Sequence, residues 1–138
     1  MWPKSGATHW GPVAFLVGDF ALLVTVGVEA ALAMHIAHDF VPGILASTIV
    51  GMAAGMGAGL LTALAVRPAL GSIETAVPTM IGGMTGGLAV CLVMLVAGRI
   101  SGMFTLGLGA ATGVVLFSML MAFDRACRRR FDQHRWRA

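Results

Sequence analysis

Four methionines form the most prominent set of side chains that could bind a ligand. Met52 and Met56 are four residues apart, and Met80 and Met84 repeat this spacing later in the chain. Residues four apart lie on one face of a helix, so each pair directs two thioethers the same way. Thioether sulfur is a soft donor that selects copper(I) over hard cations. These four residues predict a soft-metal site, and the alternative is that they only fill gaps in the packing.

A second group of potential ligands follows the first apolar segment. His35 and His38 are three residues apart, and Asp39 comes directly after them. The three side chains share one helix face if the helix extends that far. Imidazole and carboxylate groups bind zinc and copper. We expect a first contact for a metal ion here, and the alternative is a set of polar residues that end a helix in water.

Three acids complete the set of chemically active residues. Asp19 and Glu29 interrupt an apolar segment, and Glu74 follows a later loop. An acid in the middle of a membrane helix costs about 2.5 to 3.5 kcal/mol on insertion scales. We therefore expect the three to serve an ion or proton pathway. The alternative for the first two is a structural hydrogen bond to a hydroxyl of a neighbouring helix, at Ser47, Thr48, Thr85 or Thr112.

The elements that must position these residues are four apolar segments. The chain has 138 residues, of which 58% are hydrophobic and 11% are charged, whereas soluble domains contain about 25% charged residues. A hydrocarbon core about 30 Å thick needs about 20 apolar residues per helix. The sequence predicts an all-α, single-domain bundle of four transmembrane helices over residues 12–37, 43–66, 75–97 and 101–123, with a basic tail over 124–138.

Glycines at helical spacing indicate where these helices pack. A face without side chains lets another helix backbone approach closely. Seven glycines on the second, third and fourth segments are expected to form such faces: Gly51, Gly55, Gly59, Gly83, Gly87, Gly109 and Gly113. The faces exceed what one small bundle needs, so we expect a homo-oligomer or docking into a larger membrane complex.

The distribution of basic residues predicts the orientation of the bundle. If both termini are cytoplasmic, Arg99 alone among the 9 Lys and Arg residues lies outside. This bias favours an N-in, C-in protein of the inner cell membrane. The basic tail is expected to bind anionic lipid headgroups rather than nucleic acid. Cys91 and Cys127 are expected on opposite sides of the membrane, where no disulfide can join them.

Other kinds of chemistry lack the residues they require. No two histidines lie deep on facing helices, as a bis-histidine haem site would need. No glycine-rich loop joins a strand to a helix, and no nucleophile is paired with a base. We therefore expect no haem, no nucleotide and no enzymatic activity.

The methionine and glycine motifs resemble those of a known family. Met-x-x-x-Met spacing beside Gly-x-x-x-Gly occurs between Gly51 and Gly59, and again between Met80 and Gly87. It resembles the motif pair of the eukaryotic high-affinity copper transporters. The run S-I-E-T-A-V-P-T-M-I-G-G-M-T-G-G is also similar to small glycine- and methionine-rich bacterial membrane proteins associated with heavy metals. The resemblance implies that the two methionine pairs are thioether ligands of copper.

Together these patterns predict a small integral membrane protein that transports or delivers a soft metal ion, with copper the expected ion. The path would be a ladder of methionine, histidine and carboxylate groups, because a row of weak sites suits transfer better than storage. Two alternatives stay open. One is a non-catalytic accessory or assembly subunit of a larger membrane enzyme complex, and the other is a proton-coupled transporter of a small solute that uses Glu29 or Asp19.

Overall fold

The computed structural model describes residues 12–70 and 76–135 of the chain. Four helices account for nearly all of them: α1 (Pro12–Phe40), α2 (Ile44–Leu70), α3 (Ala76–Ala97) and α4 (Gly102–Arg135). All four are long and apolar enough to cross a membrane. The prediction of an all-α chain with four apolar helices, of the kind found in multi-pass membrane proteins, is confirmed.

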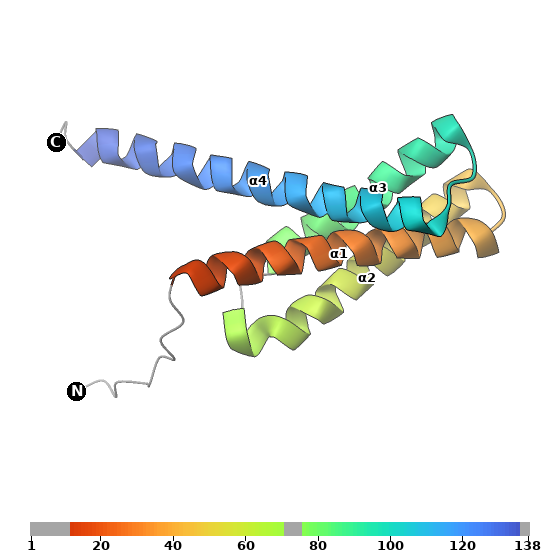
Figure 1. The fold of residues 1–138 in the computed structure, drawn as a ribbon, viewed down its shortest axis with the longest axis horizontal. Helices are drawn as coiled ribbons and strands as arrows, with labels where there is room; N and C mark the ends of the chain where they lie inside the picture. Colours follow the sequence, from red (N-terminus) through yellow and green to blue (C-terminus); the bar gives the residue numbers. More distant parts are fainter. Residues whose placement is uncertain (1–11, 71–75, 136–138) are drawn as a thin grey trace.

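The helices alternate in direction, so two short connections meet at one end of the molecule (Figure 1). The α1–α2 connection turns at Gly43 and the α3–α4 connection at Gly98, with φ angles of 90° and 77°. Glycine adopts such angles without the steric cost of a Cβ atom. We call this end of the bundle the connecting end. The opposite end, where α1 begins and α4 finishes, is called the terminal end.

Three helices extend beyond the apolar segments that predicted them. α1 continues to Phe40, so its last turn contains His38 and Asp39, and α2 continues to Leu70. α4 continues to Arg135, so most of the predicted basic tail is a further stretch of the same helix. Apolar composition shows where a chain can enter a membrane, but arginine and glutamine are also good helix formers. The ends of the apolar segments were therefore not the ends of the helices.

Helix α1 is the centre of the bundle. It contacts each of the other three helices, whereas α2 and α4 do not contact each other within the described residues. Most of the buried apolar side chains belong to α1: Leu22, Leu23, Val26, Ala30, Ala31, Met34 and Ala37. α4 lies along α1 near the connecting end and diverges from it toward the terminal end (Figure 1). An aromatic contact between α1 and α4 joins Phe20 and Phe117, whose ring centroids are 5.2 Å apart.

Glycines bring the other helices close to α1. A Cβ atom on Gly51 of α2 would lie 2.9 Å from the Cα atom of Met34, and one on Gly113 of α4 would lie 2.6 Å from the carbonyl oxygen of Leu23. The seven glycines expected in packing faces are all buried: Gly51, Gly55, Gly59, Gly83, Gly87, Gly109 and Gly113. Helices of the same chain fill these faces. The glycines therefore give no separate argument for an oligomer.

Candidate functional site

The two histidines near the end of α1 face different neighbours. His35 turns toward α4, where its Nδ1 lies 3.3 Å from the Thr105 hydroxyl. The Nδ1 of His38 lies 3.0 Å from the carbonyl oxygen of Met34, one turn back on α1. Asp39 is exposed on the surface, with a carboxylate oxygen 3.9 Å from Nε2 of His35. The three predicted ligands are therefore near one another in sequence, but the structure does not direct them at one point.

The hydrogen bond at His38 fixes the state of its other ring nitrogen. A carbonyl oxygen can only accept, so Nδ1 carries the proton and donates it to Met34. In the neutral ring, Nε2 then carries a lone pair. This atom is buried and has no hydrogen-bond partner among the residues that the structure describes. Histidines that bind metals commonly hold their other N–H against a carbonyl or carboxylate in this way, so the His38 ring is oriented as a ligand would be.

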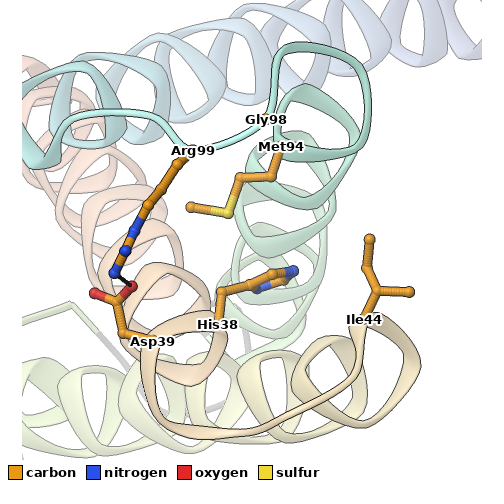
Figure 2. Close-up of a pocket in the computed structure, with 6 residues that line it drawn as sticks. All are labelled: His38, Asp39, Ile44, Met94, Gly98 and Arg99. Atoms are coloured by element: carbon orange, nitrogen blue, oxygen red, sulfur yellow. Dashed lines mark hydrogen bonds and ion pairs between the residues drawn. The ribbon is translucent and has the colours of Figure 1, made fainter.

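A pocket of about 400 Å³ opens beside His38 at the connecting end. Its lining comes from α1, α2, α3 and the α3–α4 connection: His38, Asp39, Ile44, Met94, Gly98 and Arg99. In Figure 2 the Met94 side chain reaches from α3 and the His38 ring from α1 into this space. The ion pair between Arg99 Nη2 and Asp39 Oδ1, at 2.6 Å, spans one side of the pocket. The pocket thus combines one soft donor and one imidazole with a charged rim.

Sulfur-containing side chains gather in and against one apolar cluster, and one of them, Met94, also lines the pocket. Met34 and Cys91 are buried in one apolar cluster, at 0% and 6% exposure, and Met52 and Met94 pack against that cluster. These four residues come from three helices, α1, α2 and α3. Thioethers and thiols are the side chains that select copper(I). We call Met34, Met52, Cys91 and Met94 the sulfur cluster.

The thiol of the sulfur cluster has a hydrogen bond of its own. Thr48 Oγ1 lies 3.1 Å from Cys91 Sγ and 2.7 Å from the carbonyl oxygen of Ile44. The hydroxyl has one proton, and the carbonyl needs a donor, so the Cys91 S–H donates to the Thr48 oxygen. Cys91 is therefore a protonated thiol in this arrangement, whereas the thioethers and the His38 lone pair can bind a cation without losing a proton.

The four methionines predicted as a ladder have unequal surroundings. Met52 and Met56 are half-buried where α2 meets α3, and a Cβ atom on Gly83 would lie 3.2 Å from the Cα atom of Met56. Met80 and Met84 are 41% and 39% exposed on the outer side of α3. The inner pair thus lies between helices, and the outer pair lies largely on the surface of the bundle.

Glu29 has a partner that the sequence did not suggest. The Thr62 hydroxyl of α2 lies 2.8 Å from each carboxylate oxygen, and both residues are half-buried. In the α1–α2 contact, Gly51 faces Met34 and Gly55 faces Ala30, so Thr62 lies roughly 9 Å beyond the point opposite Glu29. Side chains lean toward the N-terminus of their own helix. In an antiparallel pair the two therefore lean toward each other across that distance.

The remaining acids do not join this site. Asp19 lies exposed on α1, closer to the terminal end. Glu74 lies outside the described residues. Among the residues that the structure describes, no three or more His, Cys, Asp or Glu side chains form a group that could hold a metal ion.

Three residues of this region, Met94, Arg99 and Thr62, were not chosen from the sequence as site residues. Met94 lies three residues after Cys91, on the same face of α3 and near the same end as His38, so its position in the chain was an available signal. Arg99 was the one basic residue that the sequence placed on the non-cytoplasmic side of the membrane. Nothing in the sequence singled out Thr62 as the partner of Glu29. Comparisons of the chain with protein-family models, with curated proteins and with solved structures found no match.

Proposed function

We propose that the protein binds copper(I) at the connecting end and passes it into the bundle through the sulfur cluster. The observation that supports this most is an apolar cluster that contains or contacts three methionines and a cysteine from three helices, one of which, Met94, also lines the pocket beside His38. The Nε2 atom of His38 is buried and has no partner among the described residues. Methionine alone is common in apolar cores. A buried nitrogen lone pair is not explained by packing, because buried polar atoms normally have a partner.

The donor types favour a soft monovalent ion over a hard divalent one. Calcium and magnesium take six or more oxygen ligands, and the pocket offers one carboxylate that is already paired with Arg99. Zinc sites use three or four histidine, cysteine or carboxylate ligands, and no such group occurs among the described residues. Copper(I) accepts thioether and imidazole ligands, which are the groups available here.

In the proposed orientation the connecting end faces outward and both termini are cytoplasmic, because all the Lys and Arg residues except Arg99 then lie inside. Copper(I) would move from the pocket past Met34 and Met52 toward the middle of the bundle. Glu29, held by Thr62 on the α1–α2 side, supplies a carboxylate at that depth. A carboxylate in the membrane can balance the charge of a passing cation or carry a proton in exchange.

A flux assay with matched methionine variants tests the proposal. The full chain is reconstituted in liposomes that contain a copper(I)-responsive dye, and copper(I) is added outside under reducing conditions. The double variant Met34→Leu with Met52→Leu should lose most of the flux, because leucine keeps the volume but removes the sulfur. Met103→Leu is the control, since this residue of α4 is 81% exposed. Equal flux in the double variant and the wild type would refute the proposal.

An accessory subunit of a larger membrane complex is the second candidate. The observation that favours it is the exposure of α4, because only 11% of its most apolar window is buried inside the chain. Phe123 and Met119, on the part of α4 that diverges from α1, are 69% and 64% exposed. A partner helix could cover this side as well as lipid does. Purification of the native protein in mild detergent tests this candidate, since a subunit would bring a stoichiometric partner that Phe123→Ser removes.

A further inference from the structure

We propose that the pocket at the connecting end is the capture site for copper(I), with Nε2 of His38 and the thioether sulfur of Met94 as its two ligands. The assignment rests on the proposed function and adds to it a defined first position for the ion. Met94 was not among the ligands expected from the sequence. His38 was expected to act with His35 and Asp39, and the structure instead places it beside Met94.

The Met94 thioether and, in the neutral ring, the Nε2 atom of His38 each offer a donor atom that carries no proton. The Nδ1–H of His38 is donated to the Met34 carbonyl oxygen, so the lone pair of Nε2 is the free one. That nitrogen is buried without a partner on the protein. Met94 is half-buried and belongs to the sulfur cluster. Neither ligand has to lose a proton when copper(I) arrives, whereas the Cys91 thiol would have to.

The size of the pocket suits an ion that still carries part of its hydration or a small carrier ligand. Its volume is about 400 Å³, and a water molecule takes up about 30 Å³ in the liquid. The pocket therefore holds several water molecules in addition to the ion. Exchange of these waters for His38 and Met94 would happen at the rim, before the ion reaches the apolar interior.

The ion pair of Arg99 with Asp39 controls the charge at the mouth of this pocket. Arg99 is 82% exposed and Asp39 37% exposed, so the pair is in contact with water. While it is formed, the mouth carries no net negative charge that would attract hard divalent cations. The guanidinium also repels a cation, so Arg99→Gln should speed the binding of copper(I) by a few-fold at low salt, with less effect at high salt.

A competition titration of the purified full chain tests the assignment. The probe is copper(I) held by the coloured chelator bicinchoninate, with ascorbate present to keep the copper reduced. His38→Asn is the informative variant, because the asparagine amide can still donate to the Met34 carbonyl but has no atom in the place of Nε2. Met94→Leu removes the sulfur and keeps the volume. Met103→Leu serves as the matched control on an exposed methionine.

We expect wild type and Met103→Leu to take one copper(I) per chain from the chelator. His38→Asn and Met94→Leu should each raise the dissociation constant at least about tenfold, since loss of an outer-shell partner alone costs about 10- to 100-fold at metal sites. In the wild type, the ¹⁵N signal of His38 Nε2 should shift on binding and that of Nδ1 should move much less. A structural role of His38 would not produce this selective shift.

Two results would overturn the assignment, and they differ in what else they refute. If His38→Asn and Met94→Leu bind copper(I) within twofold of the wild type, the capture site lies elsewhere. The flux of copper(I) through the Met34→Leu and Met52→Leu double variant then decides whether the proposed function is correct. If the folded wild type takes no copper(I) from the chelator, both the capture site and the proposed function are refuted, and a small organic solute becomes the occupant to test in this pocket.

Discussion

Substitution of Gly113 by alanine tests whether α4 packs on α1 as closely as the structure has it. A Cβ atom at this position would lie 2.6 Å from both the carbonyl oxygen of Leu23 and the Cα atom of Val24. Both are backbone atoms of a helix, so neither can move without the helix. Ordinary contact begins at 3.4 Å, which means that the two helices must separate by up to roughly 0.8 Å. Overpacking of this kind costs about 1 to 3 kcal/mol.

Gly107 provides a matched control on the same helix. A Cβ atom there would meet nothing within 4 Å. Alanine is favoured over glycine in a helix by about 1 kcal/mol, and this gain applies to both substitutions. The difference between Gly113→Ala and Gly107→Ala therefore isolates the steric cost. We expect Gly107→Ala to be neutral or stabilising and Gly113→Ala to be less stable than Gly107→Ala by about 1 to 3 kcal/mol.

The buried thiol of Cys91 supplies the assay. Cys91 is 6% exposed, so a thiol-reactive fluorogenic maleimide should label it only when the bundle opens. Cys127 is the second free cysteine, and Cys127→Ser removes its background. Labelling is followed during thermal or SDS-induced unfolding in detergent micelles. Equal stability of the two alanine variants would show that α4 does not approach α1 at Gly113, and the central position of α1 would have to be revised.

Three further predictions concern individual contacts. Thr62→Val should destabilise the bundle by about 1 kcal/mol, because hydrogen bonds between membrane helices are worth about 0.6 to 1.7 kcal/mol, and the same labelling assay measures it. Arg99→Gln should change stability by less than about 1 kcal/mol, since its pair with Asp39 is in contact with water; a larger loss would show that the pair holds the connecting end together. Phe117→Leu should cost about 0.5 to 1.5 kcal/mol through loss of the edge-to-face contact with Phe20, whereas Phe104→Leu, on the exposed side of α4, should be near neutral by thermal unfolding.

The four helices could be predicted because their apolar lengths are set by the thickness of a bilayer. Their arrangement could not. The helices are apolar on nearly every side, so hydrophobic periodicity does not distinguish the face that meets another helix from the face that meets lipid. Glycine spacing indicates that a helix face packs closely against another helix, but it does not show which helix that is. Nothing in the sequence indicated that α1, rather than the glycine-rich α2 or α3, would contribute most of the buried apolar side chains.

The kinds of ligand in the candidate site could be predicted from the sequence, but not all of the residues that supply them. His38 was expected as a ligand from its position at the end of an apolar segment. Its separation from His35 depends on the rotation of α1, which places one ring in the pocket that Met94 also lines and the other ring beside Thr105. The Glu29–Thr62 contact was missed, since the hydroxyls expected as partners of the acids were those of Ser47, Thr48, Thr85 and Thr112. Thr62 reaches Glu29 because both side chains lean along their helices toward each other.

The proposal that copper(I) is bound by sulfur and imidazole at the connecting end is tested most directly by X-ray absorption at the copper edge. The full chain is purified in detergent after reduced copper has been supplied and excess removed. We expect one copper(I) per chain with both sulfur and nitrogen scatterers, and loss of the nitrogen scatterer in His38→Asn. Copper bound only to oxygen ligands, or a folded chain without copper, would contradict it.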